Sequence, residues 1–484
     1  MPWLNTSESL TLEKLKGHVI LLDFWTYCCI NCIHVLDDLK YLEEKYKNDP
    51  FIVIGVHSPK FPNEKDIRNI RSAVARYEIE HPILVDSEMR LWKSYGIRAW
   101  PSYLLIGTDG KVISMLSGEG KRDELDMTIK EALEKGRQEG TIAKKRIHPK
   151  PDIHLESFLK FPSKLEMNNS GDQLFISDSN HNRILHLQLE DDTIGNVISI
   201  IGNGKQGYYD GSFLDAEFNK PQGLAFKDNK LFIADTENHL IREADLISKT
   251  VRTIAGTGQQ GYVRTYQGNA LNASLSSPWD LALDEDVLYI AMAGLHQIWK
   301  LNIRTGIIKS FAGSGKEDII DGPLKEAALA QPSGLSLDEK NKKLYFADSE
   351  VSGLRYVDIE NKNVKTLIGH GLFVFGLKNG SFKEALLQHP LGLEFVENKI
   401  FLADTYNHAI RIADLDARVM TNLIHSPRKG VCMIGDENCD ALPLFEPNDL
   451  KYKENKLYIT DTNNHLIRIY DFKTKSLDDL YILE

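Results

Sequence analysis

Residues 221–245 read PQGLAFKDNKLFIADTENHLIREAD, and the pattern returns at 390–414 as PLGLEFVENKIFLADTYNHAIRIAD and at 447–471 as PNDLKYKENKLYITDTNNHLIRIYD. Six similar units open on prolines spaced 54 to 59 residues apart: Pro162, Pro221, Pro278, Pro332, Pro390 and Pro447. Each unit contains short apolar runs that predict four strands. Six four-stranded repeats predict an all-β six-bladed propeller over residues 152–484, because a closed ring leaves few exposed sheet edges.

The first 145 residues follow a different pattern, in which strand and helix signals alternate. We expect strands at 19–22, 51–54, 83–85, 103–106 and 111–114, and helices within 31–47, around 64–77 and over 122–138. This order predicts an α/β domain over residues 1–145, with a central sheet covered by helices. A charged, proline-punctuated linker at 146–151 then leads to the propeller.

Three of the five cysteines fall within one segment, LLDFWTYCCINC at 21–32. They are Cys28, Cys29 and Cys32, whereas a disulfide-stapled domain would spread its cysteines along the chain. A Cys-x-x-Cys pair at a helix start suits thiol chemistry, since the helix N-terminus favours a thiolate. The spacing predicts that Cys29 attacks a disulfide and that Cys32 resolves the mixed disulfide.

The repeated run P-x-G-L-A…L-F-I-A-D-T-x-N-H-x-I resembles the NHL repeat, and LLDFWTYCCINC is similar to the TlpA-like branch of the thioredoxin superfamily. Their order, with the Cys-Cys-Ile-Asn-Cys string, resembles the NHL-repeat-containing protein 2 family. The resemblance implies that Asp23 handles the proton of the resolving Cys32. It also implies that Pro101 is a cis-proline that faces the cysteines and presents backbone to an incoming peptide.

Two positions depart from the superfamily pattern. Cys28 stands where an aromatic residue is usual, which makes it an alternative disulfide partner. The bulky Trp100 precedes Pro101, so we expect it to cover part of the groove and restrict substrates. Because Ile30-Asn31 lacks the common proline, the sequence leaves open whether the pair reduces, oxidises or isomerises disulfides.

Several motifs of the repeats resemble ligand sites, but their positions favour structural roles. One repeat position is histidine in four units: His239, His296, His408 and His465. Equivalent positions of a propeller lie around a ring, too far apart for one zinc ion, so we predict that these histidines cap turns. The glycine motifs at 202–207 and 256–261 match G-x-G-x-x-G but open no helix, which predicts inter-blade turns. We expect neither a cofactor nor a metal.

The overall composition restricts partners and location. The formal net charge of −11 would repel a phosphate backbone, so we expect no nucleic acid partner. The segment MPWLNTSESLTLEKLKG lacks the features of a signal peptide, and no segment approaches 18 uninterrupted apolar residues. We therefore expect a cytoplasmic protein with no membrane partner, in which Cys432 and Cys439 are reduced thiols.

These observations lead to three functional hypotheses. The first is a thiol-disulfide oxidoreductase in which Cys29 and Cys32 act and the propeller binds a protein substrate or partner. The second is a non-enzymatic scaffold whose thioredoxin-like domain is a docking surface, so whether the chain is an enzyme stays open. The third, a propeller-centred hydrolase or lyase, needs polar residues on the innermost strands, which we expect to be mostly apolar.

Overall fold

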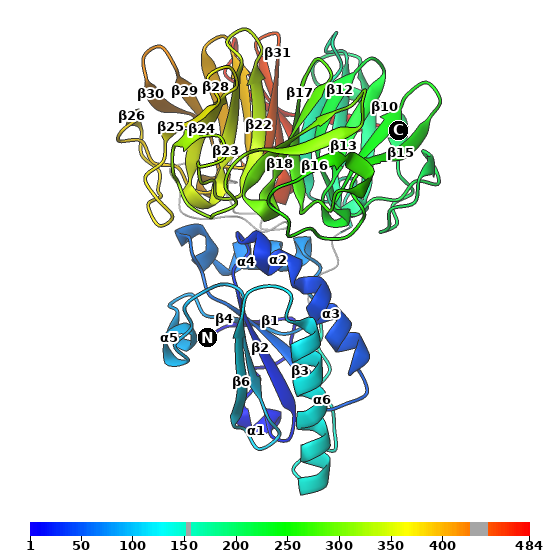
Figure 1. Cartoon of the computed structure of the whole chain (residues 1–484), viewed down its shortest axis with the longest axis vertical. Coiled ribbons are helices and arrows are strands. Elements are labelled where there is room, and N and C mark those ends of the chain that lie inside the picture. Colours follow the sequence, from blue (N-terminus) through cyan, green and yellow to red (C-terminus); the bar gives the residue numbers. More distant parts are fainter. Residues whose placement is uncertain (152–155, 426–443) are drawn as a thin grey trace. The chain divides into compact units, whose positions relative to one another are not determined.

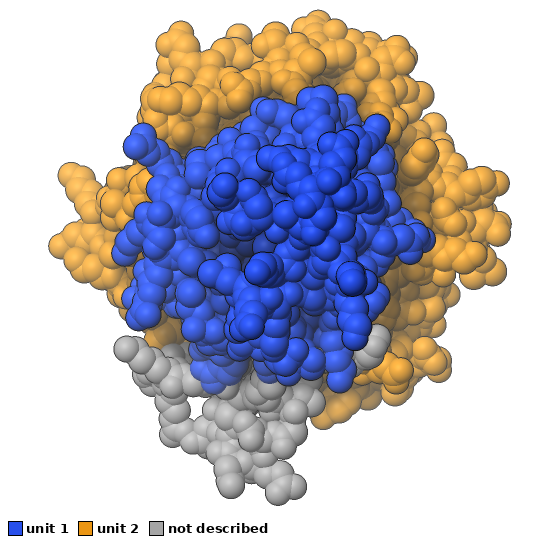
Figure 2. All heavy atoms as spheres, turned by 90° about the horizontal axis from the view of Figure 1, so that it is seen from below, with its two compact units in different colours: residues 1–155 blue, residues 156–484 orange. Residues whose placement is uncertain are grey.

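The computed structural model describes residues 1–151, 156–425 and 444–484. Two compact units make up the chain, Met1–Leu155 and Glu156–Glu484, which are coloured separately in Figure 2. The predicted linker at 146–151 falls within the first unit, and its role as a linker stays a prediction. Within the described ranges, no helix has the length and apolar character that crossing a membrane requires.

The first unit is a thioredoxin-like domain built on a six-stranded sheet in the order β1-β4-β3-β2-β5-β6 (Figure 1). Its strands are β1 (Trp3–Leu4), β2 (Val19–Trp25), β3 (Phe51–His57), β4 (Ile83–Val85), β5 (Ser102–Ile106) and β6 (Val112–Ser117). Its helices are α1 (Leu12–Leu15), α2 (Ile30–His34), α3 (Leu36–Lys45), α4 (Ile67–Arg76), α5 (Arg90–Ser94) and α6 (Arg122–Glu139). Strand β2 pairs parallel with β3 and antiparallel with β5, and every residue of β2 and β3 is buried. Such doubly covered strands explain the continuous apolar runs in the sequence.

Two predicted helices differ from the observed ones. The helix expected within 31–47 is divided into α2 and α3 at Val35. The helix expected around 64–77 begins at Ile67, because Asp66 caps α4 through a hydrogen bond from the Arg68 amide. A 3-10 turn over Pro62–Lys65 precedes it.

The second unit is a six-bladed β-propeller, as predicted. Blade 1 contains β7 (Pro162–Met167), β8 (Gln173–Asp178), β9 (Arg183–Leu189) and β10 (Ile194–Ile201). Blade 2 contains β12 (Pro221–Lys227), β13 (Lys230–Asp235), β14 (Leu240–Asp245) and β15 (Thr250–Ala255). Blade 3 contains β17 (Pro278–Asp284), β18 (Val287–Met292), β19 (Gln297–Asn302) and β20 (Ile307–Ala312).

The remaining three blades follow the same plan. Blade 4 contains β22 (Pro332–Asp338), β23 (Lys343–Asp348), β24 (Gly353–Asp358) and β25 (Asn363–Ile368). Blade 5 contains β27 (Gly392–Val396), β28 (Lys399–Asp404), β29 (Ala409–Asp414) and β30 (Val419–Ile424). Blade 6 contains β31 (Pro447–Lys453), β32 (Lys456–Asp461), β33 (Leu466–Asp471) and β34 (Leu477–Asp479).

Five blades have an additional short strand on the outer edge, which the four-strand prediction did not include. In blades 2 to 5 these are β11 (Gly211–Ser212), β16 (Gln267–Asn269), β21 (Gly322–Pro323) and β26 (Gly380–Ser381). They are too short to give a periodic signal in the sequence. In blade 1 the additional strand is β35 (Tyr481–Leu483), which pairs parallel with β10 and closes the ring.

The four recurrent histidines end the short 3-10 turns of blades 2, 3, 5 and 6, as predicted, and also join each of these blades to the following one. The Nδ1 atom of His239 accepts a hydrogen bond from the Ser277 amide at 3.0 Å. His296, His408 and His465 accept in the same way from Gln331, Glu446 and Phe161. Each of the four histidines also has a left-handed backbone, with φ between 51° and 59°. Within the described ranges, no three His, Cys, Asp or Glu side chains are grouped as metal ligands.

Candidate functional site

The loop after β2 places the three clustered cysteines in different environments. Cys29 is the N-cap residue of α2 and is partly exposed, whereas Cys28 and Cys32 are buried. The Cys29 carbonyl accepts hydrogen bonds from the amides of Cys32 (3.0 Å) and Ile33 (3.2 Å), which begins the helix. The geometry therefore puts one accessible thiol at a helix N-terminus and a second, buried thiol one turn later, as the spacing predicted. All three cysteines are free thiols.

Asp23 lies on β2, six residues before Cys29, and is 1% exposed. Burial raises its pKa to about 7, although the nearby His81 opposes the rise. Burial also raises the pKa of Cys32 well above its ordinary range, and a hydrogen bond with Cys29 and the charges of Cys29 and Asp23 add to this. A buried thiol that resists ionisation thus lies near a carboxyl group that can accept a proton near neutral pH.

The Trp100–Pro101 peptide bond is cis, as the resemblance implied. The Trp100 indole is held by two contacts. Its Nε1 donates to the Ser58 carbonyl at 3.0 Å, and its ring lies against Trp92 with centroids 4.3 Å apart. The side chain is only partly exposed and has a fixed orientation beside Pro101. That Trp100 restricts substrates stays a prediction.

Glu64 is a buried carboxylate that the sequence analysis did not identify. Its side chain is completely buried and accepts four hydrogen bonds at 2.7 to 3.0 Å. The donors are the Thr26 hydroxyl and the amides of Cys28, Lys60 and Phe61. Glu64 therefore ties the cysteine loop to the loop after β3. The residue comes 36 positions after Cys28, so no local motif indicates the contact.

We expect Glu64→Gln to lower the free energy of unfolding of the first unit by about 2 kcal/mol or more. The glutamine NH2 group would replace one carboxylate oxygen, and the N–H groups that donate to this oxygen would lose their acceptor. Calorimetric unfolding of the full chain measures the effect as a lower midpoint of the transition of this unit. Glu131→Gln, an exposed change on α6, is the matched control. Equal midpoints for the two variants would show that the Glu64 contacts add no stability.

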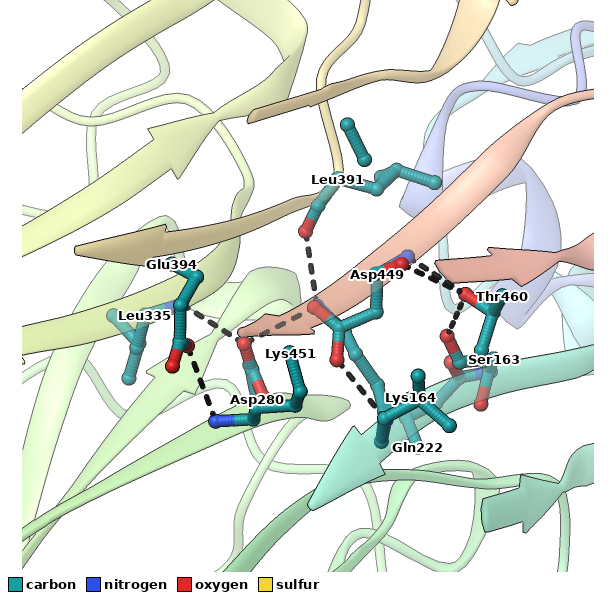
Figure 3. A network of polar contacts seen from close by, with 12 residues as sticks. Ser163, Lys164, Gln222, Asp280, Leu335, Leu391, Glu394, Asp449, Lys451 and Thr460 are labelled. Atoms are coloured by element: carbon teal, nitrogen blue, oxygen red, sulfur yellow. Dashed lines mark hydrogen bonds and ion pairs between the residues drawn. The ribbon is translucent and has the colours of Figure 1, made fainter. Parts of the chain in front are cut away.

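A second polar cluster lies on the innermost strands of the propeller (Figure 3). The Lys164 side chain is fully buried, and its Nζ lies 3.1 Å from Asp280 Oδ2, 3.0 Å from the Leu391 carbonyl and 3.6 Å from Asp449 Oδ1. The Asp280 carboxylate also accepts a hydrogen bond from the Leu335 amide. These residues come from the innermost strands or the segments that lead into them, so one ammonium group connects several blades.

A second lysine extends this cluster. Lys451 Nζ lies 3.3 Å from both Glu166 Oε2 and Glu394 Oε2. Burial raises the pKa of Glu394 to about 7, with Lys451 opposing the rise. The expectation that the innermost strands are mostly apolar is therefore wrong for this part of the ring. Charged residues are tolerated there because each carboxylate pairs with a lysine.

Comparison with known proteins agrees with both units. A thioredoxin-like family model matches residues 17–112, and an NHL repeat model matches residues 218–243. NHL repeat-containing protein 2 of Gallus gallus is 38% identical over 518 residues, which cover 100% of this chain and 70% of the chicken protein. The chain belongs to the NHL repeat-containing protein 2 family. This family membership covers both the thioredoxin-like domain and the propeller.

Two further relatives differ in how much they share with this member of the NHL repeat-containing protein 2 family. Protein SUPPRESSOR OF QUENCHING 1, chloroplastic, of Arabidopsis thaliana is 43% identical over 504 residues. The match covers 100% of this chain but 47% of the plant protein, so the chain spans about half of that relative. Thiol-disulfide oxidoreductase ResA of Bacillus cereus is 28% identical over 123 residues, covering 25% of this chain and 68% of ResA. The first unit thus has relatives among thiol-disulfide oxidoreductases.

Proposed function

We propose that the chain is a thiol-disulfide oxidoreductase in which Cys29 and Cys32 form the active pair. The observation that carries this proposal is the contrast between the two thiols at α2. Cys29 is accessible at the helix N-terminus, and Cys32 is buried behind it beside Asp23. Attack on a substrate requires an accessible thiol, and release requires a protected second thiol close by. The similarity to ResA supports the same chemistry.

The reduction of a substrate disulfide proceeds in two steps. The Cys29 thiolate attacks one substrate sulfur, which forms a mixed disulfide and releases the other substrate sulfur as a thiolate. Cys32 then gives its proton to Asp23 and attacks Cys29 Sγ, which forms the Cys29–Cys32 disulfide and releases the second substrate thiolate. Two electrons pass from the cysteine pair to the substrate. The same steps in reverse oxidise a substrate dithiol.

Cys28 is not a member of the active pair in this proposal. Its side chain is 1% exposed, and its amide is bound to the Glu64 carboxylate. The thiol lies 3.8 Å from the Thr26 hydroxyl. These contacts hold Cys28 away from solvent, while Cys29 remains accessible.

We also propose that the propeller binds the protein substrate or partner. The loops after the glycine turns carry exposed apolar side chains at related repeat positions in several blades. They include Tyr208 (61% exposed), Tyr209 (63%), Tyr262 (62%), Val263 (56%) and Phe373 (69%). Exposed apolar side chains that recur around a ring of loops suit a surface that binds a protein. The net charge of −11 supports a protein rather than a nucleic acid as the partner, and the grouping of three cysteines in one short segment, unlike the spread of a disulfide-stapled domain, suits the cytoplasm as the proposed location.

Trapping in the full chain tests the proposed function. We expect Cys32→Ser to accumulate a mixed disulfide between Cys29 and a protein disulfide such as insulin, visible as an adduct by mass spectrometry. Wild type should accelerate the reduction of insulin by dithiothreitol, and Cys29→Ser should lower the rate to that of dithiothreitol alone. Cys28→Ser is the control and should keep most of the activity.

The scaffold hypothesis makes the opposite prediction in this experiment. Wild type and Cys29→Ser would then be equally inactive toward insulin, and Cys32→Ser would form no adduct. The geometry gives no comparable support to a propeller-centred hydrolase or lyase. The acidic side chains of the central cluster, Asp280, Asp449, Glu166 and Glu394, are already paired with lysines.

A further inference from the structure

Polar side chains gather around Asp23 on one face of the first sheet. Cross-strand pairing puts Asp23 beside Gly55 and Trp25 beside His57, and paired residues project from the same face. His81 follows in the segment before β4. Asp23, Trp25, His57 and His81 are each at most 3% exposed. All four have buried polar atoms without a hydrogen-bond partner among the residues that the structure describes. Buried polar atoms of this kind are costly, which points to a functional role for the group.

Gly55 leaves space in the middle of this group. A Cβ atom at Gly55 would lie 3.0 Å from Trp25 Nε1, 3.3 Å from His81 Nε2 and 2.5 Å from a methyl carbon of Ile83. Any side chain at this position would displace its neighbours. The glycine therefore lets the unpartnered nitrogen of His81 approach the part of the sheet that carries Asp23.

The pKa values of the two histidines of the group shift in opposite directions. Burial lowers the pKa of His57 to about 3, so its ring is neutral and does not take up a proton near neutral pH. Burial alone would also lower the pKa of His81, but the carboxylates of Glu43 and Asp23 raise it above the ordinary value. His81 Nδ1 lies 3.3 Å from Glu43 Oε2. The Glu43 side chain is 27% exposed, so this pair reaches solvent.

We propose that His81 and Glu43 connect the buried Asp23 with solvent and set the pH at which Asp23 accepts the proton of Cys32. This inference rests on the proposed function. A proton received by Asp23 lies in a site with 1% exposure and needs a path to water before the next turnover. The neutral form of His81, with its proton on Nδ1, accepts this proton at Nε2 and becomes an imidazolium. Its Nδ1 then gives a proton to Glu43, which exchanges with solvent.

The remaining groups near this path are few. Cys29 and Cys32 of α2 and Tyr103 of β5 interact electrostatically with Asp23 or with each other. The Glu80 carboxylate also raises the pKa of His81, but less than Glu43 and Asp23 do. Tyr103 stays protonated, because burial raises its pKa far above neutrality. The Glu43–His81 pair is thus the described group that links the Asp23 site with a partly exposed side chain.

Rapid mixing tests the proposal in the full chain, with Cys28, Cys432 and Cys439 replaced by serine. The reduced protein reacts with one equivalent of 5,5′-dithiobis(2-nitrobenzoate). Attack by Cys29 releases one thionitrobenzoate, and attack by Cys32 on the mixed disulfide releases the second. The rate of the second release is measured against pH in wild type, Glu43→Gln and His81→Gln.

In wild type, we expect the rate of the second release to reach half of its maximum at a pH near the Asp23 pKa of about 7. This pH is the midpoint of the profile. Glu43→Gln should move the midpoint upward by about half a pH unit or more, because the imidazolium form of His81, whose charge favours Asp23 ionisation, is less stable without the Glu43 carboxylate. Below the midpoint the second release should then be about threefold slower. His81→Gln should shift the midpoint in the same direction. Glu44→Gln, on the same helix but 71% exposed and paired with Lys47, is the matched control and should not change it.

An unchanged midpoint in Glu43→Gln, with normal wild-type release, would overturn the proposal and leave the proposed function intact. A wild type that never releases the second thionitrobenzoate would instead overturn the proposed function, and the connection with it. Because Glu43 is partly exposed on α3, Glu43→Gln should fold even if His81→Gln does not. The Glu43→Gln variant alone therefore decides whether the proposal holds.

Discussion

Replacing Lys164 by methionine is expected to lower the free energy of unfolding of the propeller by about 3–5 kcal/mol. Methionine fills a similar volume but removes the ammonium group. Asp280 and Asp449 then keep buried carboxylates that have lost their positive partner. Urea unfolding of the full chain, followed by far-ultraviolet circular dichroism in the range where the β-propeller contributes most, should show the propeller transition at a lower urea concentration.

Two variants control this prediction. Lys205→Met, at an exposed position, should change the stability little. Adding Asp449→Asn to Lys164→Met should recover part of the lost free energy of unfolding, because the double variant no longer buries the Asp449 carboxylate without a lysine beside it. If Lys164→Met were as stable as Lys205→Met, the central ion pairs would not contribute to stability.

Asp23→Asn should stabilise the first unit by about 4 kcal/mol above pH 7, while it slows the step that needs Asp23 as a base. The folded-state pKa of about 7 lies above the ordinary value of 3.8. Between these two values the folded chain holds a proton that the unfolded chain has lost, so wild-type stability falls as the pH rises through this window. Asparagine is neutral throughout and does not incur this loss.

Unfolding measured at pH 4 and at pH 8 tests the sign of this effect. The gain from Asp23→Asn should be small at pH 4 and close to its maximum at pH 8. Asp37→Asn, exposed on α3, is the matched control and should show no such difference. A gain that is the same at both pH values would mean that the Asp23 carboxyl group is not held protonated by burial.

Much of the architecture could be predicted from the sequence because it depends on periodic signals. The recurring prolines and D-T-x-N-H strings mark equivalent positions of the blades, so the six-bladed ring follows from the repeats alone. The helix start at Cys29 also follows locally from the Cys-x-x-Cys spacing. Element bounds were less predictable, as the division of the helix at Val35 shows.

The contacts that surround the sites could not be predicted in this way. Glu64 binds a loop 36 residues earlier, and Lys164 pairs with Asp280, 116 residues later. In a single sequence such charged residues look like ordinary surface positions, because only folding shows that they are buried. Glu394 falls on a predicted innermost strand, but the apolar residues next to it led to the interpretation of that strand as mostly apolar, so the charged side chains of the ring were not predicted. Cys432 and Cys439 lie outside the described residues, so their predicted reduced state remains a prediction.

The pairing of β35 with β10 has a consequence for synthesis of the protein. Residues 194–196 of blade 1 are matched by residues 481–483, which leave the ribosome only after all six repeats have been made. Until then blade 1 has an unpaired edge, and the ring is open between its first and sixth blades. A nascent propeller therefore exposes an unpaired edge of β10, which can pair with other chains, until the ribosome has translated the remaining repeats. We expect chaperones that shield such edges to be needed most during that interval.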